Sequence, residues 1–386
     1  MSNTSSDSRK RVLSGMRPTG KLHLGNYMGA LHNWVRLQHE YDCYFFIADL
    51  HALTTDYADV SKLSENTREV ALDFLAAGLD PKKSVLFVQS KVPQHAELHT
   101  LLSMITPLSW LERVPTYKDQ IEQLKEKDLA TYGFLGYPLL QSADILLYQP
   151  DFVPVGQDQV AHVELTREVA RRFNYFYKHP YRSSTAVSRV EEAELVRDMN
   201  VELADESLIG RHNGTYAKAA SSDDADVSPG ILTDPDVLLT PSPKLPGTDG
   251  RKMSKSYGNT ILLSDPEPVV RQKLKPMVTD PARIRRSDPG NPEVCPVFDL
   301  HKVFSSAETQ QKAREGCTTA SIGCIECKSW VADAIMTQLA PIQERRAKYE
   351  ANPGLVKDIF AAGNQKAAAR AEQTMREVRA AMGLGE

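Results

Sequence analysis

The sequence has little of what marks membrane, secreted or strongly basic proteins. None of its apolar runs approaches the roughly 20 residues that a membrane-spanning helix needs. The first residues, Met1–Arg11, are polar and serine-rich and lack the apolar core of a signal peptide, so we expect a cytoplasmic protein without a membrane partner. Because the formal net charge is −4, a nucleic acid would have to bind local basic patches and not the whole surface.

Cysteine is scarce and unevenly placed. Cys43 stands alone in an apolar run and is expected to be a buried strand residue. The other four crowd into one C-terminal segment with the spacing C-x21-C-x6-C-x2-C: Cys295, Cys317, Cys324 and Cys327. In a cytosolic protein such a group indicates metal binding more than disulfides. Four thiolates suit tetrahedral zinc or a [4Fe–4S] cluster, and the spacing alone does not choose between them.

The segment Gly250–Asn259 carries the clearest chemical signal that is present. Lys252 and Lys255 lie three residues apart among hydroxyl residues, with glycines on both sides. Lysine is a point charge on a flexible stem and can follow a phosphate that moves. Two lysines at this spacing are by themselves typical of a solvated turn. The run Lys-Met-Ser-Lys-Ser, however, resembles the second signature loop of class I aminoacyl-tRNA synthetases, which predicts a strand and a His-Φ-Gly-His-like turn upstream.

The predicted upstream turn is present. A short strand over Arg11–Gly15 leads into a turn, and His23-Leu24-Gly25-Asn26 follows at the start of a helix. The N-terminus of a helix presents free N–H groups and a positive dipole end, which favour a phosphate. Without the lysine loop, a lone surface histidine at a helix start would be the simpler interpretation.

The first half of the chain alternates strands and helices. Apolar runs at Tyr44–Ala48 and Ser84–Val88 predict buried parallel strands, and Ser61–Ala77 has a helical pattern between them. This alternation predicts an α/β fold with a doubly wound parallel sheet. Ligands of such sheets bind beyond the carboxyl ends of the strands, where His51 is one of the polar residues. His51 could equally be a capping or core histidine.

A second candidate site lies in the apolar, helix-like run Tyr137–Tyr148. Asp144 is a carboxylate inside this run, and a buried carboxylate is costly without a partner. It is either part of a structural salt bridge or cap, or an acceptor for a donor on the substrate. The strand that follows, Val153–Gln159, ends in a glycine turn with three polar residues.

Together these stretches resemble the bacterial-type tryptophanyl-tRNA synthetases, which belong to class I, and the resemblance covers nearly the whole chain apart from one insertion. It implies that His23, Asn26, Lys252 and Lys255 are catalytic. It implies an ATP site formed by Arg17, Pro18, Thr19, Gly25, Asn26, Gly156, Gln157, Asp158, Lys252, Met253, Ser254, Lys255 and Ser256. Many bacterial members have glutamine where this chain has Arg17.

The same resemblance implies the amino-acid site and the partners. Asp144 would accept the indole N–H of L-tryptophan, Tyr137 and Gln159 would hold its amino group, and His51 would lie near its carboxylate. The reaction uses ATP with Mg²⁺ and delivers tryptophan to tRNA(Trp), and the family is expected to be homodimeric. The segment Gly316–Cys324 is similar to the cysteine motif of a subset with a [4Fe–4S] cluster, which favours iron–sulfur over zinc.

We therefore expect a Rossmann-like catalytic domain and a C-terminal all-helical domain. The expected boundaries are 1–182 for the first catalytic part, 183–241 for an acidic insertion, 242–275 for the second catalytic part, and 276–386 for a helical anticodon-binding domain with the cysteines. The alternatives are a tyrosyl-tRNA synthetase, a catalytically silent RNA-binding paralogue, or a small-molecule nucleotidyltransferase. The Asp144 helix, the two lysines and the C-terminal helices, respectively, argue against them.

Overall fold

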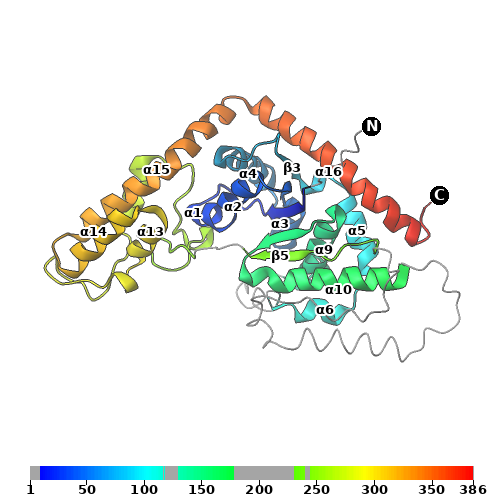
Figure 1. Cartoon of the computed structure of the whole chain (residues 1–386), viewed down its shortest axis with the longest axis horizontal. Helices are drawn as coiled ribbons and strands as arrows, with labels where there is room; N and C mark the ends of the chain where they lie inside the picture. Colours follow the sequence, from blue (N-terminus) through cyan, green and yellow to red (C-terminus); the bar gives the residue numbers. More distant parts are fainter. Residues whose placement is uncertain (1–8, 116, 118–128, 178–229, 240–243, 386) are drawn as a thin grey trace, which may run out of the picture.

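The computed structural model describes residues 9–115, 117, 129–177, 230–239 and 244–385. Its centre is a five-stranded, wholly parallel sheet in the order β3-β2-β1-β4-β5 (Figure 1). The strands are β1 (Arg11–Met16), β2 (Asp42–Ile47), β3 (Ser84–Val88), β4 (Phe152–Val155) and β5 (Asp236–Leu239). The predicted doubly wound α/β fold is confirmed.

Helices cover both faces of this sheet. Up to Tyr177, the described helical segments are α1 (Leu24–Asn26), the π-helical turn η1 (Tyr27–Leu31), α2 (His32–Leu37), α3 (Asp49–Asp56), α4 (Leu63–Ala77), η2 (Gln89–Lys91), α5 (Gln94–Ser103), α6 (Leu108–Arg113), α8 (Tyr132–Leu135), α9 (Tyr137–Tyr148), η3 (Gln157–Gln159) and α10 (Val160–Tyr177). The later ones are η5 (Lys255–Tyr257), α12 (Glu267–Leu274), η6 (Pro292–Val294), α13 (Pro296–Phe304), α14 (Ala307–Thr318), α15 (Cys324–Glu350) and α16 (Pro353–Ala381). None of these described helices is both long and apolar enough to cross a lipid bilayer.

Strand β2 shows why the sheet is buried on both faces. Its alternate residues enter different cores: Phe45 lies in the cluster that contains Trp34 and Phe74, and Phe46 lies in the cluster of Phe87. The rings of Trp34 and Phe45 stack with centroids 4.8 Å apart. Side chains of a strand point alternately to its two sides, so a continuous apolar run fills both layers.

Strand order reverses at β1, with β2 and β3 on one side and β4 and β5 on the other. The crevice of a doubly wound sheet opens at such a reversal, beyond the carboxyl ends of the strands. The topology therefore places the residues after β1 and β4 at the entrance of one crevice.

Strand β5 differs from the expectation for the insertion. Residues 183–229 and 240–241 of the predicted insertion lie outside the described residues, but β5 pairs in parallel with β4 from Phe152↔Asp236 to Val155↔Leu239. The catalytic sheet thus already includes residues 236–239, before the predicted boundary at 242. The low average apolar content of this stretch concealed a strand of only four residues.

The C-terminal helices divide into two parts. Helices α13 and α14 and the start of α15 extend away from the sheet, whereas α16 returns across the catalytic domain (Figure 1). Ala367, Ala371 and Met375 of α16 belong to the same core as Phe87. Helix α16 therefore packs on the sheet, although it had been assigned to the separate helical domain 276–386.

Candidate active site

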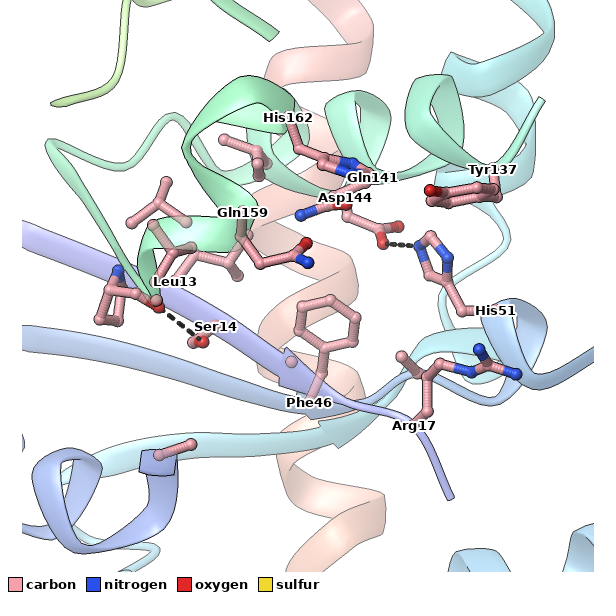
Figure 2. Close-up of a pocket in the computed structure, with 18 of the residues that line it drawn as sticks. Leu13, Ser14, Arg17, Phe46, His51, Tyr137, Gln141, Asp144, Gln159 and His162 are labelled. Carbon is pink, nitrogen blue, oxygen red and sulfur yellow. Dashed lines mark hydrogen bonds and ion pairs between the residues drawn. The ribbon is translucent and has the colours of Figure 1, made fainter. Parts of the chain in front are cut away.

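A cavity of about 340 Å³ opens at the carboxyl ends of β1 and β4 (Figure 2). Small-molecule sites commonly have volumes of about 300–1,000 Å³. The predicted residues that line this cavity are Arg17, His51, Tyr137, Asp144, Gly156 and Gln159. The structure therefore brings together all four residues predicted to bind tryptophan with two of those predicted to bind ATP.

Asp144 is the buried centre of the cavity's polar end, with 1% of its surface exposed. Its Oδ1 accepts hydrogen bonds from His95 Nδ1 at 2.6 Å and from Gln89 Nε2 at 2.7 Å. Its Oδ2 lies 2.8 Å from His51 Nε2, the contact drawn in Figure 2. Burial alone would raise the pKa of this carboxyl, but the charges of and hydrogen bonds from His95 and His51 lower it to about 2. Asp144 is therefore a charged acceptor at neutral pH.

Both ring nitrogens of His95 have a hydrogen-bond partner, and these partners determine which nitrogen carries the proton. It is completely buried, and its Nε2 lies 2.9 Å from the hydroxyl of Tyr148. Burial and the Asp144 charge raise the pKa of Tyr148 well above its usual value, so the phenol keeps its proton. The phenol can donate that proton to Nε2, and Nδ1–H then donates to Asp144. Oδ1 thus accepts two hydrogen bonds, whereas the contact of Oδ2 with His51 leaves a second lone pair of that oxygen for a ligand.

His51 contacts Asp144 directly in this structure. His51 is buried, with 8% exposed, so it is a paired core histidine, one of the alternatives that the sequence left open, and it also lines the cavity. The proximity of His51 to a substrate carboxylate stays a prediction.

Arg17 reaches into the same cavity from the end of β1 (Figure 2). Its Nη2 donates to Thr55 Oγ1 and lies 3.7 Å from Asp56 Oδ2. Burial lowers the pKa of Arg17, and the Asp56 charge acts in the opposite direction. Its Nε is buried and has no hydrogen-bond partner within the described part of the chain. That N–H is a donor still available to an oxyanion. Pro18 and Thr19, next in the chain, line a neighbouring cavity of about 550 Å³.

The turn at His23–Asn26 is closed by its own side chains. His23 Nδ1 accepts from the backbone N–H of Asn26 at 3.3 Å, and Asn26 Oδ1 accepts from the backbone N–H of His23 at 3.1 Å. A Cβ at Gly25 would lie 2.9 Å from the His23 ring, so only glycine fits under it. Burial and the charges of Lys255 and Lys252 lower the pKa of His23 to about 4. His23 is therefore neutral at pH 7 in the free protein.

The lysine loop meets the segment after β1. Lys255 Nζ donates to the carbonyl of Gly20 at 2.8 Å and to Thr19 Oγ1 at 3.3 Å. Burial lowers the pKa of Lys255 to about 8, with Asp73 opposing. Of its neighbours in the loop, Met253 is buried and Ser254 is half-buried, whereas Lys252 and Ser256 are exposed. The two signature loops thus come together, as predicted, with one lysine engaged and one in solvent.

Asn259 braces the lysine loop from behind, although sequence reasoning did not select it. It is 2% exposed; its Oδ1 accepts from Ser254 N–H at 2.8 Å, and its Nδ2 donates to Asp249 Oδ1 at 2.6 Å and to Lys252 O at 3.2 Å. Other residues that the sequence did not single out are Gln141 and His162, which line the cavity, and Gln89 and His95, which hold Asp144. Only Gln89 carried a signal, since it directly follows an apolar strand.

The turn after β4 is divided between the cavity and the surface. Gly156 and Gln159 line the cavity, whereas Gln157 is exposed in η3. Asp158 lies in the same turn, and its side chain lies outside the described part of the structure.

The four C-terminal cysteines are gathered in space. Charges on Cys295, Cys317 and Cys324 raise the pKa of Cys327, and together with burial they bring it to about 12. Arg283 Nη1 lies 3.9 Å from Cys317 Sγ. All four are free thiols, and within the described residues no group of three or more His, Cys, Asp or Glu side chains is arranged to hold a metal ion. Cys43, as expected, is a buried residue of β2.

Comparisons with known proteins agree with this geometry. A family model described as "tRNA synthetases class I (W and Y)" matches residues 5–190 and 200–340. The chain is similar to the tryptophan–tRNA ligase of Ralstonia nicotianae, with 52% identity over 394 aligned residues that cover 97% of this chain and 98% of the relative. It is 50% identical to the tryptophan–tRNA ligase of Thermotoga maritima, with 97% and 99% covered.

A similar solved structure is the crystal structure of tryptophanyl-tRNA synthetase from Campylobacter jejuni complexed with ADP and tryptophan. It superposes with a TM-score of 0.76 at 30% sequence identity, and the match covers 97% of this chain and 100% of that one.

Proposed function

The chain belongs to the tryptophanyl-tRNA synthetases, the class I tRNA ligases for tryptophan, and from this membership we propose which of its residues carry the reaction. The enzyme activates L-tryptophan with ATP, releases pyrophosphate, and transfers tryptophan to tRNA(Trp). The similarity to tryptophan–tRNA ligases over the full chain argues against the two alternatives of a tyrosyl-tRNA synthetase and a catalytically silent RNA-binding paralogue. One observation carries the residue assignment: a cavity with a buried acceptor, Asp144, opens at the same sheet edge as the two signature loops.

Tryptophan binds with its indole N–H donating to Asp144 Oδ2, the oxygen that His95 and Gln89 leave open. Tyr137 and Gln159 line the same cavity and take the amino group. A single acceptor fixed in a buried position rejects amino acids that lack a matching donor, because the carboxylate is then left unpaired. The free Nε–H of Arg17 can donate to an oxygen of the tryptophan carboxylate or of a phosphate. In relatives with glutamine at this position, the side-chain amide would be the corresponding donor.

ATP binds across the two signature loops. A tryptophan carboxylate oxygen forms a bond to the α-phosphorus while the bond to the pyrophosphate breaks, and no covalent enzyme intermediate is needed. His23, Asn26 and Gly25 provide a close, neutral surface for the nucleotide, because their turn is closed by its own hydrogen bonds and Gly25 has no side chain. Lys255, held at Gly20, and Lys252, in solvent, stabilise the negative charge that grows on the leaving phosphates. Pro18, Thr19, Gly156, Gln157, Asp158, Met253, Ser254 and Ser256 complete the proposed ATP site.

Mg²⁺ would enter with the phosphates, since the described residues offer no ready-made cluster of carboxylates for it. When bound, it neutralises part of the pyrophosphate charge.

The assignment is tested by ATP–pyrophosphate exchange with each amino acid in turn. Exchange should depend on tryptophan alone, and Lys255→Ala should lower its kcat by orders of magnitude while the affinity for tryptophan changes little. An equal loss in both parameters would indicate a collapsed loop and contradict the proposed role.

We also propose that the cysteine group holds a [4Fe–4S] cluster, with zinc as the alternative. Two observations support this proposal: the four thiols interact electrostatically with one another, and the cations Arg283 and Lys328 interact with them, although they are not arranged as a metal site in this structure. Such a cluster would brace a region near the tRNA-binding end of the protein. Anaerobically purified protein should then contain about four irons per chain, and Cys324→Ser should impair tRNA charging more than pyrophosphate exchange. One zinc without iron would favour the alternative.

A homodimer is proposed from the exposed apolar side chains near α6. Met104, Leu108, Tyr132 and Phe176 are 41–70% exposed, and Phe176 lies against Arg172, which also contacts Trp110. Exposed apolar patches of this kind mark association surfaces. Leu108→Asp should yield a monomer by light scattering, and an unchanged mass would place the interface elsewhere. The proposed cytoplasmic location, where tRNA charging takes place, and the divisions at 182 and 275 also stay proposals, whereas β5 moves the end of the insertion to before residue 236.

A further inference from the structure

The two signature loops are joined by a short antiparallel ribbon. Leu263 N–H donates to Leu22 O, and Leu24 N–H donates to Ile261 O, each at 2.9 Å, with a bridge between His23 and Leu262. One strand of this ribbon, residues 22–24, runs directly into the His23 turn. The other, residues 261–263, follows the lysine loop after one intervening residue beyond Asn259. The geometry of the ribbon therefore sets the distance between the loops.

Helix α15 holds the second strand of the ribbon. Gln343 Nε2 donates to the carbonyl oxygens of Leu263 at 3.0 Å and Asp265 at 2.8 Å. Asp265 Oδ2 in turn accepts from Leu262 N–H at 2.7 Å. The side-chain amide of Gln343 therefore makes two hydrogen bonds to the segment that follows the lysine loop.

The same helix holds the first strand through a buried carboxylate. Arg346 donates to Asp73 Oδ1 and Glu69 Oε2, and the other Asp73 oxygen accepts from Leu22 N–H at 2.7 Å. The side chains of Arg346 and Asp73 are 4% and 1% exposed. Gln343 and Arg346 are three residues apart and so lie on one face of α15.

We propose that Gln343 and Arg346 are positioning residues for adenylate formation, which fix the ribbon, and through it both ATP loops, to helix α15. That helix begins at Cys324, and Gln343 lies 19 residues further along it, about 28 Å at 1.5 Å per residue. The cysteine region and the ATP site are therefore attached to the same helix, which has Pro341 inside it. This proposal rests on the assignment of His23–Asn26 and Lys252–Ser256 to ATP.

The main test is Gln343→Met, which keeps the length of the side chain and removes both donors. The matched control is Gln338→Met, at an exposed position of the same helix. In tryptophan-dependent pyrophosphate exchange, we expect Gln343→Met to lower kcat/KM for ATP about tenfold, the effect of a lost hydrogen bond that leaves carbonyls unpaired. The KM for tryptophan should stay within twofold and the melting temperature should match the control.

A double-mutant cycle separates positioning from general support. If Gln343 acts through the lysine loop, Lys255→Ala combined with Gln343→Met should lose little more than Lys255→Ala alone. Additive losses, an equal rise in both KM values, or kinetics like those of Gln338→Met would overturn the proposal. A harmless Lys255→Ala would instead overturn the ATP assignment beneath it.

Arg346 needs a gentler change, since its removal leaves two buried carboxylates unpaired and can prevent folding. Arg346→Lys keeps the charge but replaces the planar fork that bridges Asp73 and Glu69. It should also lower kcat/KM for ATP about tenfold with tryptophan KM unchanged, whereas Lys348→Met, an exposed site two residues on, should not. Wild-type kinetics for Arg346→Lys would limit the positioning role to Gln343 and refute the assignment of Arg346.

Discussion

Replacing Asp144 by asparagine keeps the shape of the side chain but should abolish its function, because its neighbours determine which way the amide faces. His95 Nδ1–H and Gln89 Nε2 both donate to the Oδ1 position. An asparagine has one acceptor oxygen, and we expect it at the Oδ1 position, because two donors meet it there and only His51 contacts the Oδ2 position. The amide NH₂ is then forced into the Oδ2 position and directs a donor at the indole N–H of tryptophan.

The expected penalty has two parts. A hydrogen bond to a charged group is lost, worth about 1.5–3 kcal/mol, and two donors are left facing each other, which costs about 1–3 kcal/mol more. A total of about 2.5–6 kcal/mol corresponds to a loss of about 10²–10⁴ in kcat/KM for tryptophan. Asp144→Ala, which removes the acceptor without adding a donor, should be no worse than Asp144→Asn.

The assay is pyrophosphate exchange at varied tryptophan and, separately, at varied ATP. The KM for ATP should stay near wild type, which distinguishes a lost tryptophan acceptor from a damaged active site. The reasoning is refuted if Asp144→Asn retains kcat/KM for tryptophan within about threefold of wild type, since the amide would then be free to turn.

Three further predictions follow from charge and packing. Burial lowers the pKa of Lys255 to about 8, so its ammonium is charged below that pH and loses its charge above it; kcat/KM for ATP should therefore fall as pH rises through about 8. In Lys255→Arg this fall should be absent up to about pH 10. If the pH profile of that variant is the same as that of wild type, Lys255 is not the source of the fall. The pKa of Asp144 in the folded protein, about 2, lies below its ordinary value of 3.8, so the ionised carboxylate contributes about 2 kcal/mol to the free energy of unfolding, at about 1.4 kcal/mol per pKa unit. This contribution is complete above pH 4 and is lost as pH falls towards 2. In urea unfolding, the difference in free energy of unfolding between wild type and Asp144→Asn should therefore shrink over that range, and a constant difference would contradict the prediction. Gly363→Ala would place a Cβ 1.7 Å from Leu86 O and should cost about 3 kcal/mol in urea unfolding, whereas Gly354→Ala in the same helix should cost far less; equal effects would show that α16 does not pack this closely.

The strands and both signature loops were predictable because their signals are local. An apolar run such as Tyr44–Ala48 is buried on both faces whatever surrounds it, and the lysine run has a recognisable order of residues. What holds Asp144 was not predictable, since His95 and Asp144 are 49 positions apart and only the packing of α5 against α9 brings them together. The sequence before His95, Pro-Gln, carries no pattern that indicates a buried histidine.

The packing of helix α16 on the sheet was not predictable for a similar reason. Its alanines and regularly spaced arginines resemble an exposed helix, and small side chains give little periodic signal. In the structure those alanines allow the helix to lie close to the sheet, and Gly363 marks the point of nearest approach at Leu86. Arg379 forms a paired contact with Glu97 of α5 at 2.6 and 2.7 Å, which joins the end of α16 to the helix that carries His95.

The proposed tryptophan acceptor and the proposed ATP loops are fixed by different helices. Asp144 is fixed by side chains from α3, η2 and α5, all within the first hundred residues. The ATP loops are tied to each other by the ribbon and to α15 by Gln343 and Arg346. Because α16 also contacts α5 through Arg379 and Glu97, only a change confined to α15 is expected to alter how ATP is held without changing the tryptophan acceptor. It follows that substitutions along α15 should alter the kinetics of ATP, and substitutions around His95 those of tryptophan.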